Sequence, residues 1–239
     1  MPYPSFPKEY QGPAPIEKQV DWLAKRFSLS AVATHEFIVS TLPTLRLPAG
    51  AEGWFALPSV RALARRHFPR VTDPAEQYRR AVQFIIDVLS TTRPIDSEKF
   101  AERITPQNFR QHQRTTAALT RIEEMQKGDI LVLPAQFGMR YGGKSVIESR
   151  KAFVKEEFGI GIFGVGCMAF THTERFVRYE QLHCSAPGDE CTFTAHREIL
   201  GWEGSPTLSF LCDQLEFEAI PIDWAFHRGS VTGFVPSDC

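Results

Sequence analysis

The sequence lacks a hydrophobic run long enough to cross a membrane. Its longest apolar stretch, Phe158 to Phe170, is interrupted by glycines and is shorter than the ~20 residues that a spanning helix requires. The N-terminus also lacks the order of a basic segment, an apolar segment and a small-residue cleavage site, so we do not predict a signal peptide. We therefore expect a soluble, cytoplasmic protein that does not enter a membrane.

Cysteine is scarce, with five residues, an odd number spread over 239. This usage does not fit a disulfide framework, and we expect reduced thiols. One turn-rich stretch gathers possible metal ligands, namely His183, Cys184, Cys191 and His196. Paired Cys-x-x-Cys spacing is missing, and neighbouring His183 and Cys184 would point to opposite faces of a strand. We predict no metal and no cofactor, although the sequence leaves open whether these four side chains meet.

A strong excess of either charge is missing as well, because the net charge is -1. The average conceals an asymmetry: residues 1–128 hold 18 Lys and Arg against 13 Asp and Glu, whereas residues 129–239 hold 9 against 15. Proteins that bind nucleic acid usually carry a clear basic excess, so we do not favour a nucleic acid partner.

Residues 1–15 contain five prolines, which fix φ and remove N–H donors, so this arm should be extended. Apolar residues then recur at helical spacing in several segments. The strongest helix start is Asp73-Pro74-Ala75-Glu76, where Asp73 can cap, Pro74 suits the first turn and Glu76 can complete a capping box. The predicted helices cover about 16–27, 30–42, 59–68, 73–89 and 105–127, and 53–57 is a short strand or anchored loop.

After Gly128 the apolar pattern changes from helical to strand-like. Residues 215–219 alternate between apolar and acidic, which predicts a strand with one wet face, and 230–235 is its expected neighbour. Other predicted strands are 130–133, closed by Pro134, and 176–184 and 191–195 around the turn at 186–189. Residues 146–158 resemble a charged surface helix, and Phe158 to Phe170 fits either a strand or a helix with a small-residue side.

These segments predict an α+β fold, with an N-terminal helical part packed on a C-terminal, mostly antiparallel β-sheet part. The expected organisation is a proline-rich arm at 1–15, a helical part at 16–128 and a β-rich part at 129–239, and the last two can form one globule.

One string fits a chemically specific pattern, the phosphate-binding P-loop: Gly138-x-x-x-x-Gly143-Lys144-Ser145. In that loop, main-chain amides hold phosphates, Lys144 would reach the terminal ones, and Ser145 would bind Mg²⁺. Asp213, which follows an apolar run, is a candidate acidic partner for the Mg²⁺ of a bound nucleotide.

Three features argue against this phosphate site. Residues 134–137 separate the apolar run from Gly138, and Arg140 and Tyr141 are bulky where the backbone must approach phosphate closely. The residues that follow do not read as the strand–helix units of a parallel sheet. We favour a structural turn in which Gly142 and Gly143 supply unusual φ angles and Lys144 is solvated.

A second glycine pattern, Gly159-x-Gly161-x-x-Gly164, matches the dinucleotide-binding fingerprint, with Glu180 near the position of its acidic ribose partner. Charged residues precede it where a strand is required, so we favour close backbone packing.

Two polar clusters, 172–175 (HTER) and 188–190 (GDE), lie beside apolar segments. Such clusters can hold acid–base pairs, but they also cap helices and turns, and we favour capping.

Arginine is concentrated in two neighbouring predicted helices, at Arg61, Arg65, Arg66, Arg70, Arg79 and Arg80. A face of this kind, centred on the first four, could hold an acidic protein or another polyanion. We therefore predict a non-enzymatic binding or assembly protein. The alternative is a phosphate- or nucleotide-binding enzyme or switch that uses residues 138–145. The sequence does not indicate an oligomeric state.

Overall fold

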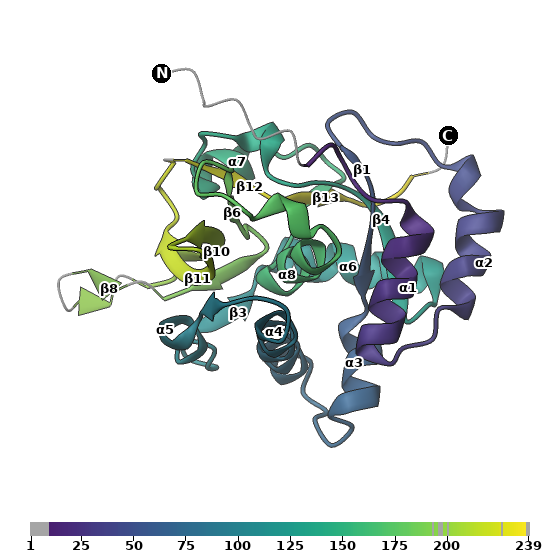
Figure 1. The fold of residues 1–239 in the computed structure, drawn as a ribbon, viewed down its shortest axis with the longest axis horizontal. Helices are drawn as coiled ribbons and strands as arrows, with labels where there is room; N and C mark the ends of the chain where they lie inside the picture. The colour runs from purple at the N-terminus through teal and green to yellow at the C-terminus, as the bar shows by residue number, and fades with distance from the viewer. Residues whose placement is uncertain (1–9, 193, 196–197, 200, 226, 238–239) are drawn as a thin grey trace.

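The protein has an α+β fold in which helices pack around two sheets (Figure 1). The structure is a computed structural model that describes residues 10–192, 194–195, 198–199, 201–225 and 227–237. The N-terminal part of the predicted arm therefore lies outside the described residues, and residues 10–15 form neither helix nor strand, as predicted. Among the described residues, no helix is both long enough and apolar enough to cross a bilayer.

Local side-chain caps mark the starts of several helices. The Ser59 side chain accepts a hydrogen bond from the Ala62 amide, and Asp73 accepts one from the Glu76 amide. The Glu76 carboxylate was expected to close a capping box but accepts hydrogen bonds from Arg79 and Arg80. The helices are α1 (Ile16–Phe27), α2 (Val32–Ser40), α3 (Val60–His67), α4 (Pro74–Ser90), α5 (Glu98–Ala101), α6 (Gln113–Gln126), α7 (Val146–Ala152) and α8 (Ile162–Thr171), with 3-10 turns η1 (Leu42–Thr44), η2 (Met139–Tyr141) and η3 (Thr173–Arg175).

The first sheet has the order β1-β4-β13-β5, and all its pairings are antiparallel. Its strands are β1 (Gly53–Pro58), β4 (Ile130–Gln136), β13 (Thr232–Phe234) and β5 (Glu157–Gly159). The prediction that Pro134 closes β4 is wrong, because the strand continues to Gln136. On the β13 side only Ala135 and Gln136 are paired, so the missing N–H of Pro134 interrupts no pairing there.

The second sheet has the order β12-β6-β10-β11-β2, and β7 joins it by pairing with β10 and β3. Two of its pairings are parallel, β12 with β6 and β11 with β2. The strands are β2 (Ile95–Asp96), β3 (Phe109–Gln111), β6 (His183–Ser185), β7 (Asp189–Cys191), β10 (Gly204–Leu211), β11 (Gln214–Pro221) and β12 (Arg228–Ser230), and a separate hairpin joins β8 (Thr194–Ala195) to β9 (Glu198–Ile199).

Residues 230–235 were expected to pair with the strand at 215–219, and this prediction is wrong. The segment passes from one sheet to the other: β12 ends at Ser230 beside β6, and β13 begins at Thr232 between β4 and β5. Val231, which is fully buried, lies at the crossing, donating to the Ser185 carbonyl and accepting from the Ile160 amide. The strand at 215–219 has the predicted alternation of buried and partly exposed residues over most of its length.

The residues on either side of position 128 contribute to both sheets. β1 pairs with β4 along its whole length, from Gly53 with Ala135 to Pro58 with Ile130. In the second sheet, β2 pairs with β11 and β3 pairs with β7.

α8 lies in the middle of the molecule, between α1 on one side and β10 on the other (Figure 1). The segment from Phe158 to Phe170 thus contains both elements that its pattern allowed, the end of β5 and then a helix. Every residue of α8 except Phe170 is buried. Gly166 lies against Ile85 of α4, whereas Gly164 lies against Ile160 and against Leu57 of β1.

Two predicted helices have the wrong limits. Residues 109–111 form β3, and α6 begins only after His112, because Phe109 to Gln111 pairs with β7. The helix predicted for 146–158 ends at Ala152, and Glu157 begins β5 because β13 lies alongside it. In both cases pairing with a strand distant in sequence determines the local structure.

Candidate ligand-binding cleft

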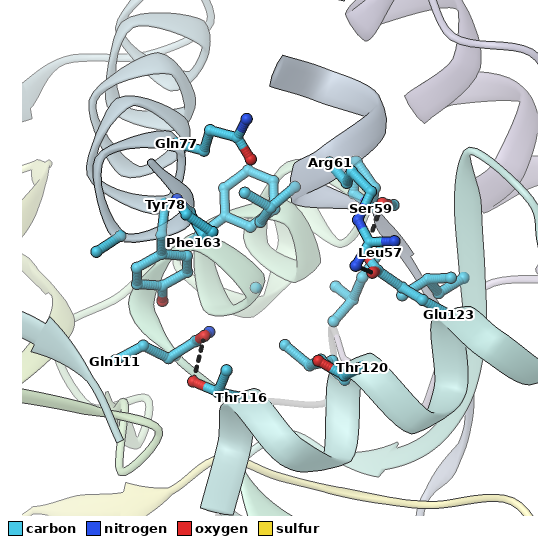
Figure 2. A pocket seen from close by; sticks show the side chains of 18 of the residues that line it. Leu57, Ser59, Arg61, Gln77, Tyr78, Gln111, Thr116, Thr120, Glu123 and Phe163 are labelled. Carbon is cyan, nitrogen blue, oxygen red and sulfur yellow. Dashed lines mark hydrogen bonds and ion pairs between the residues drawn. The ribbon is translucent and has the colours of Figure 1, made fainter. Parts of the chain in front are cut away.

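A cleft of about 450 Å³ opens between the first turns of α3 and α4, the middle of α6 and the N-terminus of α8 (Figure 2). We call it the Tyr78 cleft, after the residue of α4 whose ring forms part of its wall. Its apolar surface comes from both sheet and helices: Leu57, Leu119, Leu131, Phe158, Ile160 and Phe163. A volume of a few hundred Å³ with mainly apolar walls is typical of small-molecule sites.

Polar side chains around the cleft are bonded to one another. Ser59 donates to the Glu123 carboxylate at 2.6 Å, and Arg61 forms an ion pair with the same carboxylate at 3.4 Å. Thr116 donates to the Gln111 side chain at 2.9 Å (Figure 2). The two other arginines of the wall are also paired, Arg79 with Glu76 at 2.9 Å and Arg110 with Glu190 at 2.7 Å. The charges around the cleft are therefore largely balanced.

Tyr78 connects the cleft to a buried carboxyl group. Its hydroxyl donates to the Asp189 carboxylate, with Oδ1 at 2.8 Å and Oδ2 at 2.9 Å. The Ile162 amide, in the first turn of α8, donates to Oδ2 at 2.6 Å. Burial raises the pKa of Asp189 to about 7, although the hydrogen bonds from Ile162 and Tyr78 act in the opposite direction. Asp189 thus caps α8 from a different part of the chain.

The Tyr78 hydroxyl is itself enclosed. Burial, followed by the nearby Asp189 charge, raises the pKa of Tyr78 well above its ordinary value, while hydrogen bonds with the Phe163 main chain and the Gln111 side chain oppose this shift. Gly161 immediately precedes α8, and a Cβ there would lie 2.1 Å from the Tyr78 oxygen. The absence of a side chain at residue 161 is what allows Tyr78 and Asp189 to meet.

The P-loop-like segment lies elsewhere, between β4 and α7. Gly143 has a positive φ of 79°, whereas Gly142 has an ordinary φ of -54°, so only Gly143 supplies the unusual angle expected for the pair. The amides of this segment donate within the protein: Gly138 and Arg140 to the Gln136 side chain, Gly143 to the Arg228 carbonyl, and Ser145 to the Glu148 carboxylate. The exposed Lys144 lies with its ammonium 5.7 Å from the Tyr141 ring centre.

Ser145 and Asp213 are not brought together. Ser145 and Glu148 form a capping box at the start of α7, whose Ile147 amide bonds to the Ile222 carbonyl just after β11. Asp213 lies in the turn just before β11. The two positions are therefore at opposite ends of an eight-residue strand, which spans about 26 Å.

The arginine-rich surface is partly neutralised by its own acids. Arg65 pairs with Asp129 at 2.7 Å, Arg80 with Glu76 at 2.8 Å, and Arg61 and Arg79 are paired as described above. Arg66 and Arg70 remain exposed, and no carboxylate in the described part of the chain lies at ion-pair distance from either.

Two further motifs from the sequence are the second glycine pattern and the group of possible metal ligands. Gly159, the first residue of the second glycine pattern, ends β5, so the pattern does begin at a strand, contrary to our expectation. Gly159 packs on the main chain of Pro187 and Gly188. His183 and Cys184 are neighbours in β6, Cys191 ends β7, and His196 lies outside the described residues. Within the described residues no three His, Cys, Asp or Glu side chains are grouped to hold a metal ion.

Sequence reasoning missed the role of Tyr78 and only partly recognised Asp189. Tyr78 fits the apolar face of α4, and nothing in the local pattern distinguishes it from a core residue. Asp189 belongs to the 188–190 cluster, for which capping was favoured, but its helix begins at Ile162 and not beside it in sequence.

Comparison with known proteins adds no family to this description. No protein-family model, no curated protein and no solved structure matches the chain.

Proposed function

We propose that the protein binds a small, uncharged and largely apolar molecule in the Tyr78 cleft. The observation that supports this proposal is the cleft itself, a space of about 450 Å³ lined by side chains from both sheet and helices. A binding role agrees with the class of function that the sequence favours.

The charge balance around the cleft supports an uncharged ligand. Arg61, Arg79 and Arg110 each have a carboxylate partner, so an anion would have to compete with Glu123, Glu76 or Glu190. An apolar molecule would gain roughly 25 cal/mol for each Å² of apolar surface removed from water, without breaking these pairs. The bonded hydroxyls and amides around the cleft would orient any polar group of the ligand.

Binding is favoured over catalysis because the hydroxyl groups beside the cleft are already hydrogen-bonded within the protein. The Tyr78 hydroxyl donates to Asp189 and is further engaged by Phe163 and Gln111, and Ser59 is engaged as the cap of α3 and by Glu123. Phosphate binding at residues 138–145 is the weaker proposal, because the amides that would hold phosphate are already bonded.

The test is a titration with N-phenyl-1-naphthylamine, an uncharged dye whose fluorescence rises in apolar surroundings. The wild-type protein should bind it at one saturable site. Thr120→Trp should abolish this binding, because Thr120 points into the open space from α6 (Figure 2).

Ala117→Trp provides the matched control, since it adds the same ring to an exposed position of α6 that does not line the cleft. It should bind the dye as the wild-type protein does. Equal binding by both tryptophan variants, with both folded by circular dichroism, would show that the dye binds elsewhere and would contradict the proposal.

A further inference from the structure

A second pocket, of about 370 Å³, lies beside the N-terminal arm. We call it the Arg175 pocket; it is lined by Tyr10, Gln11, Gly12, Glu52, Met139, Arg175 and Gln181. Its walls are held in place by hydrogen bonds. Tyr10 donates to the Glu52 carboxylate at 3.0 Å, and the arm is attached to α8 through the Ala14 amide, which donates to His172 at 2.9 Å. The Gln181 side chain is bonded to the Val177 amide and to the Glu174 carbonyl.

Arg175, at the end of η3, is the cationic group of this pocket and is only 3% exposed. Its guanidinium carbon lies 5.2 Å from the ring centres of both Phe137 and Phe176, and 5.9 Å from that of Tyr10. One of its nitrogens, Nη2, donates to the Phe137 carbonyl at 3.1 Å and contacts Cys184 Sγ at 3.5 Å. Aromatic rings therefore surround a cation at the wall of an open pocket.

The charge of Arg175 lowers the pKa of Glu52 against the effect of burial, but the two side chains do not form an ion pair. Across the described ranges of the chain, no carboxylate lies within ion-pair distance of Arg175. Glu52 shares the pocket, but its carboxylate is directed to Tyr10. A buried charge is costly unless it is paired, and the carbonyl and the rings compensate it only in part. The pocket thus contains a guanidinium that an anion would complement.

We propose that the Arg175 pocket binds a small organic carboxylate, which becomes the ion-pair partner of Arg175. The planar guanidinium matches a carboxylate in geometry, and the ring of Tyr10 and the side chain of Met139 provide apolar walls for the rest of such a molecule. Glu52 disfavours a phosphate dianion, because repulsion grows with the charge of the ligand. Burial raises the pKa of Glu52, while its hydrogen bonds and the nearby charge of Arg175 act in the opposite direction.

The test uses benzoate as the probe, measured by isothermal titration calorimetry on the full chain. Benzoate should bind at one site, and benzamide and inorganic phosphate should each bind at least about tenfold more weakly, because the first lacks the charge and the second doubles it. Arg175→Gln should weaken benzoate binding by at least about tenfold. Thr120→Trp, which blocks the Tyr78 cleft, should leave it unchanged, so this result is independent of the proposed function.

Because Arg175 is buried, its loss can affect folding, and a second variant keeps the test decisive. Met139 is 45% exposed and lines the pocket, so Met139→Trp should occlude the pocket and abolish benzoate binding with Arg175 intact. Val177→Trp, at a position 42% exposed outside the lining, is its control and should bind benzoate normally. Benzoate that fails to bind, or that binds Met139→Trp as tightly as the wild type, would overturn the proposal. Tighter binding of phosphate than of benzoate would do the same.

Discussion

At the scale of the residue, the arrangement beside the Tyr78 cleft depends on a position that has no side chain. Gly161 lies against the hydroxyl of Tyr78 and the carboxylate of Asp189, and these two groups are bonded to each other in the interior. Neither can move aside without losing a buried hydrogen bond. Gly161 was read from the sequence as part of a possible cofactor fingerprint, and close packing, the explanation favoured there, is what its surroundings require.

Gly161→Ala should therefore be strongly destabilising. Its Cβ would lie 2.1 Å from the Tyr78 oxygen and 2.6 Å from Asp189 Oδ1, and relief of these clashes would break buried hydrogen bonds. We expect a loss of about 3 kcal/mol or more in the free energy of unfolding, measured by urea denaturation. Gly142→Ala is the control: its φ is -54°, its nearest contact would be an ordinary 3.4 Å, and its effect should stay within about 0.5 kcal/mol. Similar losses in both variants would contradict this account.

At the scale of the element, α8 begins at a cap supplied by β7. Asp189 accepts the Ile162 amide, and its burial favours the neutral carboxyl. Titratable groups near it are Tyr78, Arg150 and Glu190, and Arg150 also donates to the Asp189 carbonyl. The start of the central helix is thus linked to the protonation of one acid.

This link predicts a specific pH dependence of stability. The pKa of Asp189 is about 7 in the folded protein and near 4 when unfolded, so the folded state holds a proton that the unfolded state releases between these values. The contribution of Asp189 to the free energy of unfolding is complete below about pH 4. It is lost as the pH rises to about 7, and the free energy of unfolding falls by at most about 1.4 kcal/mol per pH unit. Asp189→Asn keeps the acceptor for Ile162 without the titration. The stability of wild type minus variant, from urea denaturation, should fall between pH 4.5 and 7.5; a constant difference would refute the assignment.

The elements that could be predicted from the sequence are those whose signals are local. Asp73 caps its helix as the pattern indicates, and the alternation at 215–219 identifies a strand with one wet face. The wrong limits arise where distant strands pair: β3 replaces the expected start of a helix because β7 lies beside it, and β5 shortens α7 because β13 lies beside it. The candidate sites were missed for the same reason, since Tyr78 meets Asp189 across 111 residues.

At the scale of the whole molecule, the first 128 residues and the remainder complete each other's sheets. β1 covers one side of β4 for six residue pairs, and β13 returns from the end of the chain to the other side. Both proposed pockets also draw their walls from both portions, with Tyr78 facing Phe163 in one and Tyr10 facing Arg175 in the other. Neither pocket would survive the separation of the two portions.

We therefore predict that the two portions unfold together. The four tryptophans allow a direct test: one variant retains only Trp22, on α1, and another retains only Trp202, which stacks on Arg110 of β3. Urea denaturation followed by fluorescence should give the same midpoint for both reporters. Val132→Ala, in the buried centre of β4, should lower both midpoints equally by removing about 1 to 3 kcal/mol, whereas Val39→Ala, on the exposed side of α2, should shift neither. We expect joint unfolding because β1 and β4 pair along the whole length of β1. Two separate midpoints, or a Val132→Ala shift confined to one reporter, would show instead that the portions fold independently.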